Sequence, residues 1–269
     1  MLEFKYFGVK FQILALTDLY FICKVIFILF VFSPNANAQN LVPNSGFEIF
    51  KKCPEDYITR YRKELIPGWY MPTLGTADYF NMCAKIRVGV PKNFMGYCLP
   101  KDGVAYSGLI LLLEPPVEPA KEKPENYREY LQTEFTQELQ KDNVYEVTVY
   151  YSIASYSTFA INRLGIYISK DKIGNKSSTG VLKYIPQITS DSLLIEWEHD
   201  KWHCLQGKYK ALGGEKYITI GNFYDDYKTA YRLCDFTGIS SVKKSTILKD
   251  QIAYYYFDHI SVSELKCKK

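Results

Sequence analysis

One stretch of the sequence mixes aromatic rings with short polar side chains between positions 69 and 81. Its members are Trp69, Tyr70, Asp78, Tyr79, Phe80 and Asn81. Such a mixture suits a sugar, because an aromatic face packs against the C–H side of a pyranose while short polar groups bond its hydroxyls. The alternative is that Trp69 and Phe80 belong to the hydrophobic core. The candidate ligand-binding residues are therefore Tyr70, Asp78, Tyr79 and Asn81.

Motifs that carry catalysis are missing from the sequence. It contains no G-x-S-x-G nucleophile elbow, no H-E-x-x-H metal motif, no P-loop and no dinucleotide-binding glycine pattern. A glycosidase needs two carboxylates about 5–10 Å apart, and no such pair stands out. The run NFYDDY, with Asp225 and Asp226, predicts a turn; the alternative is an acidic cluster near a sugar or a calcium ion. We predict a protein that is not an enzyme, with a hydrolase as the least favoured hypothesis.

Aromatic residues are the unusual part of the composition. The 269-residue chain has 24 Tyr, 16 Phe and 3 Trp, and tyrosine favours strands and amphipathic contact surfaces. Its 33 basic and 29 acidic side chains leave a formal net charge of +4, which is too small to indicate nucleic acid or another polyanion as the ligand. Tyr254, Tyr255 and Tyr256 alternate faces on a predicted strand, so at least one ring is expected to point outward.

Residues 1–38 have the layout of an export signal. A lysine precedes the apolar run VIFILFVF at 25–32, and ANA at 36–38 has the small-x-small pattern of a signal-peptidase site. The run is shorter than the roughly 20 apolar residues of a spanning helix; the alternative is an N-terminal anchor over 7–32. We predict a cleaved signal peptide and a mature chain, 39–269, without a membrane span. Its location is then the periplasm, the outer-membrane surface or the extracellular space.

Six cysteines remain in that mature chain: Cys53, Cys83, Cys98, Cys204, Cys234 and Cys267. An even number in an exported chain is consistent with disulfide bonds. None of them has the C-x-x-C spacing that zinc sites and thioredoxin-like centres use. We therefore expect the cysteines to be structural.

Strand-like alternation recurs along the mature chain, whereas helical periodicity is weak. In 144–153, apolar Val147 and Val149 alternate with polar Glu146 and Thr148, the period-two pattern of a half-buried strand. Similar runs lie at 104–113, 127–135, 164–169, 202–211, 215–224 and 254–265, and Gly213-Gly214 supplies a turn between two of them. Strands without a βαβ rhythm predict an all-β protein with one β-sandwich domain, 39–269.

Three segments interrupt the strand pattern. Residues 114–126, EPPVEPAKEKPEN, are rich in Pro and Glu and predict an exposed loop. Residues 235–251 are polar and rich in Ser and Lys. Residues 51–100 lack a regular pattern but contain three cysteines, so we expect a long, disulfide-tied loop region packed on the sandwich near its N-terminus.

Several runs of the sequence resemble a known family. The start NLVPNSGFE, the later Gly68-Trp69 and the final strand YFDHISV are similar to galactose-binding-like jelly rolls, the fold of many carbohydrate-binding modules. The runs GWYMPTLGTADYFNMCA, VGVPKNFMGY, NYREYLQTEF and GGEKYITIGNFYDD together resemble the N-terminal β-sandwich region of gliding-motility-associated envelope proteins, which often precedes an OmpA-type domain. The sequence ends at Lys269 without an OmpA-type domain, so peptidoglycan anchoring is not expected.

The resemblance implies two structural features. Jelly rolls of this type commonly hold a structural calcium ion between the first and last strands, and Glu48 and Asp258 occupy the matching positions. The alternative is that Glu48 caps a turn while Asp258 bonds backbone amides. The family also has cysteines at the places of Cys53 and Cys83, which implies a Cys53–Cys83 disulfide; pairing with Cys98 is the alternative. A loop of this length stabilises by roughly 3–4 kcal/mol in the chain-entropy model.

These observations predict an exported, non-catalytic module that binds polysaccharide or an envelope glycan. The alternative hypothesis is an envelope assembly or adhesion protein that binds another protein. Exposed tyrosine rings beside polar groups favour the sugar, whereas a broad apolar patch favours the protein partner.

Overall fold

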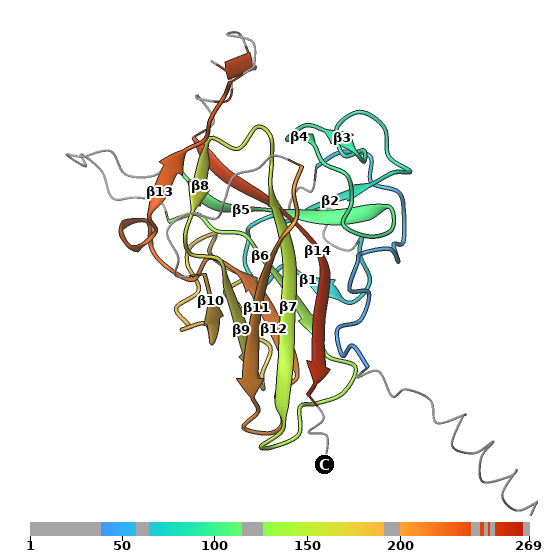
Figure 1. Cartoon of the computed structure of the whole chain (residues 1–269), viewed down its shortest axis with the longest axis vertical. Coiled ribbons are helices and arrows are strands. Elements are labelled where there is room, and N and C mark those ends of the chain that lie inside the picture. Colours follow the sequence, from blue (N-terminus) through green and yellow to red (C-terminus); the bar gives the residue numbers. More distant parts are fainter. Residues whose placement is uncertain are drawn as a thin grey trace, which may run out of the picture. The chain divides into compact units, whose positions relative to one another are not determined.

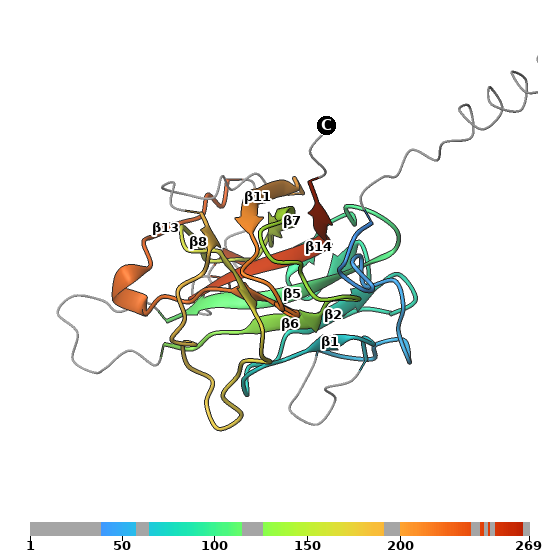
Figure 2. The ribbon, with the colours of Figure 1, turned by 90° about the horizontal axis from the view of Figure 1, so that it is seen from below.

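Two five-stranded antiparallel β-sheets form the fold in a computed structural model (Figures 1 and 2). The structure describes residues 39–57, 65–114, 126–190, 200–237, 243–244, 247 and 251–265. The chain divides into two units, Met1–Gln39 and Asn40–Lys269, and every strand below belongs to the second. The predicted signal peptide lies outside the described residues. Within the described part of the chain, no helix has the length and apolar character needed to cross a bilayer.

Each sheet draws its strands from distant parts of the sequence. The first sheet contains, in spatial order, β1 (Trp69–Tyr70), β6 (Tyr130–Glu134), β12 (Tyr217–Gly221), β9 (Gly165–Ser169) and β10 (Ile188–Thr189). The second contains β11 (His203–Lys210), β7 (Val144–Ile153), β14 (Ile252–Glu264), β5 (Ala105–Leu113) and β2 (Asp78–Asn81). Two short pairs join β13 (Tyr231–Leu233) to β8 (Phe159–Ile161) and β3 (Lys92–Asn93) to β4 (Gly96–Tyr97). This is the all-β, jelly-roll β-sandwich that the sequence predicted.

The inner faces of the two sheets share one hydrophobic core. On β7, Val147 and Val149 are fully buried, whereas Glu146 and Thr148 on the opposite face are half-exposed. Ile218 of β12 brings the first sheet into the same core. The alternating pattern at 144–153 is therefore confirmed as a strand with one buried face.

The strong strand patterns are confirmed, but one predicted connection is different. Each predicted range from 104–113 to 254–265 overlaps one of the strands, and only β14 begins before its predicted range. Gly213 and Gly214 have φ values of +94° and +87°, which glycine accommodates without strain, and they form the expected turn. The strands that they connect, β11 and β12, belong to different sheets. The turn therefore carries the chain from one sheet to the other instead of closing a hairpin.

The region 51–100 is more regular than predicted. Its described residues, 51–57 and 65–100, contain four short strands, of which β2 pairs with β5 and forms the edge of the second sheet. All four residues of β2 are buried, so it shows no alternation that could reveal a strand. Cys53 and Cys83 are bridged, with their Cα atoms 6.0 Å apart. The pairing that the resemblance implied is confirmed, and the alternative is wrong because Cys98 is buried and free.

Part of the outer face of the second sheet, over β2, β5 and the first half of β14, is covered, and we call this part the closed face. Phe80, Val90 and Met95, from the disulfide-tied region, pack there against Tyr254 and Tyr256. The two tyrosines do point away from the main core, as alternation requires, but their exposed fractions are only 1% and 0%. The expected outward ring therefore reaches the covering segment and not solvent.

The outer face of the first sheet is crossed by the connection between β9 and β10, residues 170–187, which we call the β9–β10 loop. Gln132 Nε2 donates to the Ile173 carbonyl at 3.2 Å, and the Leu182 amide donates to the Tyr130 hydroxyl at 3.0 Å. These bonds attach the loop to β6. We call this surface the cleft-bearing face, because the loop leaves two clefts at its sides.

Candidate functional site

Two of the four predicted ligand-binding residues bond each other in the core. The Tyr79 hydroxyl, fully buried, donates to the Phe47 carbonyl at 2.9 Å and accepts from Asn81 Nδ2 at 2.8 Å. Asn81 Oδ1 in turn accepts from the Cys83 amide at 2.8 Å. Both polar side chains are therefore used inside the protein, where they hold the chain around the disulfide.

Asp78 is also buried, within a cluster of acidic and phenolic groups. Its Oδ2 accepts from the Tyr254 hydroxyl at 2.6 Å. Glu129, also buried, accepts from the Tyr127 hydroxyl at 2.8 Å and the Ile110 amide at 2.7 Å. Burial, reinforced by the nearby Asp78, raises the pKa of Glu129 to about 8. Neither carboxyl group lines the two clefts described below, so this pair has a structural position.

Tyr70, the fourth predicted residue, lies on the cleft-bearing face. Its ring is half-buried on β1, and the Lys172 ammonium lies 3.3 Å from the ring centroid. A cleft of about 370 Å³ opens beside it, which we call the Tyr70 cleft. Lys51, Lys176 and the edge of β1 line this cleft. Trp69, the neighbour of Tyr70, is a core residue with an exposed fraction of 5%.

The two predicted calcium ligands lie close together beside residues 101–105, which lead into β5. A methyl group on Gly46 would lie 3.5 Å from Asp258 Oδ1 and 4.0 Å from Glu48 Oε1, so both carboxylates face this glycine. Asp258 Oδ2 accepts from the amides of Lys101 and Asp102 at 2.9 and 3.1 Å. Burial raises the pKa of Asp258 to about 7, and the amide bonds oppose that shift.

The bonds of Glu48 match the alternative to calcium that the sequence left open. Glu48 Oε1 accepts from the amides of Val104 and Ala105 at 3.0 and 3.2 Å. Among the described residues, no group of three or more His, Cys, Asp and Glu side chains gathers as a metal site would require. Calcium accepts backbone carbonyls as further ligands, and two adjacent carboxylates fit its preference for oxygen. Calcium therefore stays a prediction for Glu48 and Asp258.

The larger cleft lies on the other side of the β9–β10 loop and encloses about 630 Å³. We call it the Tyr184–Tyr224 cleft. Tyr184 comes from the loop, whereas Phe223 and Tyr224 follow the end of β12. The Tyr167 ring on β9 lies 4.9 Å from the Tyr184 centroid and 6.0 Å from that of Phe223, which connects the two walls. Tyr184 retains an exposed fraction of 37%, so part of this aromatic wall faces solvent.

Polar side chains line the rest of this cleft: Asn126, Asn175, Ser178, Lys183, Asp225 and Lys228. Asp225 begins a short 3₁₀ turn, Asp226–Lys228, and its Oδ1 accepts from the Lys228 amide at 3.0 Å. Aspartate favours this capping position because its carboxylate satisfies a free backbone amide. The turn predicted from NFYDDY is therefore confirmed, and it lies at a cleft wall.

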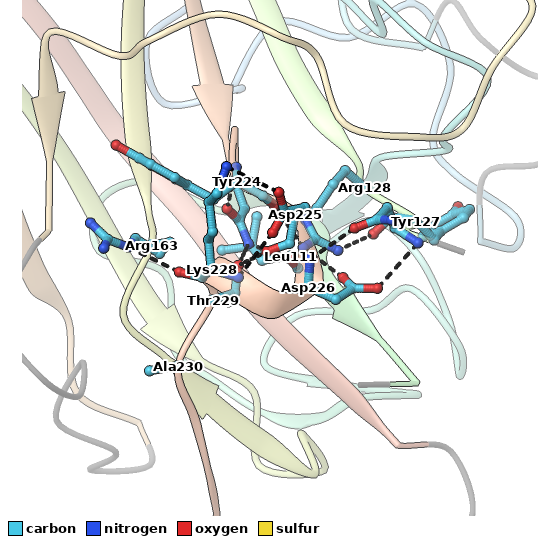
Figure 3. A network of polar contacts seen from close by, with 12 residues as sticks. Leu111, Tyr127, Arg128, Arg163, Tyr224, Asp225, Asp226, Lys228, Thr229 and Ala230 are labelled. Carbon is cyan, nitrogen blue, oxygen red and sulfur yellow. Dashed lines mark hydrogen bonds and ion pairs between the residues drawn. The ribbon is translucent and has the colours of Figure 1, made fainter. Parts of the chain in front are cut away.

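A buried ion pair supports the wall of the Tyr184–Tyr224 cleft (Figure 3). Arg128 Nη2 lies 2.8 Å from Asp226 Oδ1, and both side chains are fully buried. The same guanidinium donates to the carbonyls of Tyr127 at 2.7 Å and Tyr224 at 2.9 Å. Burial lowers the pKa of Arg128, and the adjacent carboxylate opposes that shift.

Asp226 also positions the amide side chain that lines the cleft. The Asp226 Oδ2 accepts from the backbone N–H of Asn126 at 3.2 Å. The backbone N–H of Asp226 donates to the side-chain Oδ1 of Asn126 at 2.8 Å. The Arg163 guanidinium lies 4.6 Å from the Tyr224 ring centroid and holds that ring from another strand connection. The cleft therefore presents aromatic and amide groups on a fixed base, which is what a ligand with apolar faces and hydroxyl edges requires.

Sequence reasoning found parts of this site and missed others. NFYDDY drew attention to Asp225 and Asp226, but nothing in the sequence indicates that Arg128, nearly a hundred residues earlier, pairs with Asp226. Tyr184 lies in a polar loop without a recognisable motif. A single tyrosine between lysine and isoleucine does not by itself indicate a binding site. Its aromatic neighbours in the cleft come from distant parts of the sequence and are brought to it only by the fold.

Comparison with protein-family models and with curated proteins finds no match. Among solved structures, the chain is similar to the CBM22-1 xylan-binding domain of Paenibacillus barcinonensis Xyn10C, at 12% identity and a TM-score of 0.39, over 80% of this chain and 99% of that one. It is also similar to TmCBM61, solved with β-1,4-galactotriose, at 11% identity and a TM-score of 0.35, over 85% and 100%.

A third similar structure is the K1 cleaved adhesin domain of Lys-gingipain from Porphyromonas gingivalis W83, at 15% identity and a TM-score of 0.34, over 75% of this chain and 94% of that one. All three are distant matches. The function proposed below therefore depends on the side chains of this chain.

Proposed function

We propose that this protein is an exported, non-catalytic module that binds a glycan in the Tyr184–Tyr224 cleft. One observation carries the proposal: partly exposed aromatic rings and polar groups converge in one open cleft of about 630 Å³. The rings of Tyr184 and Tyr224 offer faces to a sugar ring, and Asn126 and Asn175 offer amide groups to its hydroxyls. The Arg128–Asp226 pair fixes the wall, which lowers the entropy cost of binding.

Alanine variants of the cleft test this function. The protein is first titrated calorimetrically with a panel of polysaccharides to find one that it binds. Tyr184→Ala and Tyr224→Ala should each weaken binding of that polysaccharide at least about tenfold, or about 1.4 kcal/mol. Tyr97→Ala is the matched control, because Tyr97 is 44% exposed on β4 but does not line either cleft. Equal losses in all three variants, or binding to no glycan by a folded protein, would contradict the proposal.

Export to an oxidising compartment is part of the proposal. The Cys53–Cys83 disulfide supports it, because such bonds persist outside the reducing cytosol. We keep the resemblance to envelope proteins of gliding bacteria as a proposal for the family. Cell fractionation tests the proposed export. The protein should appear with the envelope or in the medium, and an exclusively cytosolic protein would contradict export.

We also propose that Glu48 and Asp258 hold a structural calcium ion. Its charge would relieve the repulsion between two adjacent carboxylates and would connect the start of the chain to β14. Calcium at 100 times its dissociation constant should stabilise the fold by about 2.7 kcal/mol. A thermal midpoint that is unchanged by calcium and by chelator would contradict this proposal, whereas Glu48→Gln should remove the response.

A protein partner is the second candidate function. The observation that favours it is the exposure of large apolar side chains near the disulfide-tied region, where Ile49 is 62%, Met82 53% and Ile86 87% exposed. Replacing Ile49 and Met82 by Ser should then abolish partner binding and leave the fold intact. Glycan binding that survives this change would separate the two functions.

A further inference from the structure

The β9–β10 loop separates the two clefts by a narrow ridge. Asn175 lines the Tyr184–Tyr224 cleft, and the next residue, Lys176, lines the Tyr70 cleft. Consecutive Cα atoms are about 3.8 Å apart, so the clefts meet at this point of the loop. The Asn175 amide donates to the Pro72 carbonyl at 2.9 Å, which holds the ridge against the segment that follows β1. A single extended ligand can therefore reach both clefts.

Glycine makes this close approach possible. A methyl group on Gly174 would lie 2.4 Å from the Pro72 carbonyl oxygen, and Gly174 has a φ of +159°. Any other side chain would push the loop away from the segment after β1. The narrow ridge is therefore a built feature of the fold.

The ridge is strongly basic. Four lysines, Lys170, Lys172, Lys176 and Lys183, lie on the loop and are exposed, against one acidic residue, Asp171. The loop thus has a formal net charge of +3, whereas the whole chain has +4. The segment that borders both clefts is therefore far more basic than the average of the chain.

The clefts add to this positive charge. Lys51 lines the Tyr70 cleft, and none of the described residues that line it is acidic. In the Tyr184–Tyr224 cleft the acidic lining residue is Asp225, whose Oδ2 lies 3.3 Å from the Lys228 ammonium. The carboxylate of Asp226 is paired with Arg128 in the core. Concave surfaces lined by one sign of charge concentrate ligands of the opposite sign.

In each cleft a lining tyrosine has a cation packed against its ring, although the cation itself does not line the cleft. The Lys172 ammonium lies 3.3 Å from the Tyr70 centroid, and the Arg163 guanidinium lies 4.6 Å from the Tyr224 centroid. An acidic sugar presents an apolar ring face beside an anionic group. A ring with an adjacent cation offers a partner for both parts.

We propose that the ligand is an acidic glycan, with repeated carboxylate or sulfate groups, that crosses the ridge and occupies both clefts. This inference rests on the proposed function and specifies its ligand. The lysines of the β9–β10 loop bind the anionic groups, and Tyr70 and Tyr224 bind sugar rings on the two sides.

A comparison of polymers tests the class of ligand. The protein is titrated with a polyuronate, a sulfated galactan and a neutral galactan at about 0.05 and 0.3 M salt. The higher salt shortens the screening length and so weakens the attraction between a lysine and an anionic group of the polymer. At least one acidic polymer should bind about tenfold or more tighter than the neutral one, and its affinity should fall with salt; the tighter of the two acidic polymers identifies the anionic group. Equal binding of the neutral galactan would overturn the inference and leave the proposed function standing. Binding of none would contradict both.

Variants with equal changes in charge test the location. Lys172→Gln with Lys183→Gln should weaken binding of the acidic polymer about tenfold. Lys85→Gln with Lys208→Gln removes the same charge from exposed positions that do not line either cleft and should have less than a twofold effect. Equal losses in the two variants would overturn the assignment to the ridge.

Ligand length tests whether both clefts are used. Tyr70→Ala should weaken binding of a long acidic oligosaccharide and leave a disaccharide unaffected, if the disaccharide occupies the Tyr184–Tyr224 cleft alone. An equal effect on both lengths, or on neither, would contradict a ligand that spans the ridge.

Discussion

The closed face of the second sheet and the cleft-bearing face of the first are both rich in tyrosine, yet the tyrosines are sealed on the one and partly exposed on the other. On the closed face, Tyr254 and Tyr256 bond Asp78 and Asn93 at 2.6 and 2.7 Å and have almost no exposed surface. On the cleft-bearing face, Tyr184 remains 37% exposed. Aromatic and polar composition is thus similar in the two places. What distinguishes them is the segment that covers each face.

The covering segments differ in composition and in attachment. The disulfide-tied region places apolar groups such as Val88, Val90 and Met95 on the closed face, where they complete a second core. The β9–β10 loop places Ile173 and Leu182 on the cleft-bearing face but directs lysines outward. A polar loop cannot seal a face, because its charged groups must stay hydrated. The difference shows that whether tyrosine rings on a sheet face stay exposed depends on the segment that covers the face as much as on the rings themselves.

The largest expected effect comes from the buried ion pair of the cleft-bearing face. Arg128→Met or Asp226→Leu alone should lower the free energy of unfolding by about 3–5 kcal/mol, because each leaves one buried charge without a partner. The double variant should recover most of that stability, since it removes both charges, but should still bind glycan more weakly because Tyr224 and Asn126 lose their support. Urea unfolding and calorimetry measure the two effects.

The exposed pair Lys210–Asp142, at 3.2 Å, is the control for the ion-pair experiment. Its removal should change stability by less than about 1 kcal/mol. If the Arg128→Met, Asp226→Leu double variant is stable and binds as tightly as the original protein, the pair has no role in positioning the cleft.

The disulfide should affect stability and not binding. Cys53→Ser with Cys83→Ser opens a loop with a sequence separation of 30 and should lower the free energy of unfolding by about 3–4 kcal/mol. Glycan affinity should remain within twofold at a temperature where the variant is folded, because the bridge supports the closed face. Cys204→Ser, at an exposed free cysteine, is the matched control. Affinity that falls together with stability would show that the two faces are coupled.

Glu129 should make stability depend on pH. Its pKa in the folded protein, raised to about 8 by burial and Asp78, exceeds the ordinary value of 4.5, so the folded state keeps a proton that the unfolded state releases. Its contribution is therefore fully present below about pH 4.5 and is lost as pH rises towards 8, by at most about 1.4 kcal/mol per pH unit. Glu129→Gln should flatten the unfolding free energy between pH 5 and 8, whereas Glu134→Gln, at an exposed position on β6, should not. If the unfolding free energy of Glu129→Gln depends on pH as steeply as that of the original protein, the pKa of Glu129 is not the cause of the pH dependence.

The smallest effect is expected at Tyr79. Tyr79→Phe removes a hydroxyl that bonds the Phe47 carbonyl and Asn81 Nδ2, which should cost about 1–3 kcal/mol of stability at the buried partners left unpaired. Glycan affinity should not change, because this hydroxyl lies in the core. A loss of glycan affinity without a loss of stability would contradict this expectation and would favour the site that the sequence predicted between positions 69 and 81.

The sequence predicted the fold better than the site, and the reason is physical. Alternation along β7 records the burial of one strand face directly, so 144–153 could be assigned from local pattern. The burial of Asp78 and Tyr79 depends on a segment that folds back over them, which no local pattern records. The pairing of Arg128 with Asp226 likewise depends on strands β6 and β12 being neighbours.

Net charge illustrates the same limit. The small net charge of +4 argued against a polyanionic ligand, but it is a sum over the whole chain and does not describe any one face. The fold places four of the lysines on the β9–β10 loop, between two clefts. The local charge density on which our proposal of an acidic ligand depends is therefore not visible in the average. Tyr70 shows the opposite outcome, since it was predicted from composition and does lie at a cleft.

The most direct test of the central claim is hydrogen–deuterium exchange of the protein with and without a saturating acidic polysaccharide. We predict slower exchange in two segments, 170–187 and 222–230, and unchanged exchange between 78 and 98. Protection confined to 78–98, with none in the β9–β10 loop, would contradict the account.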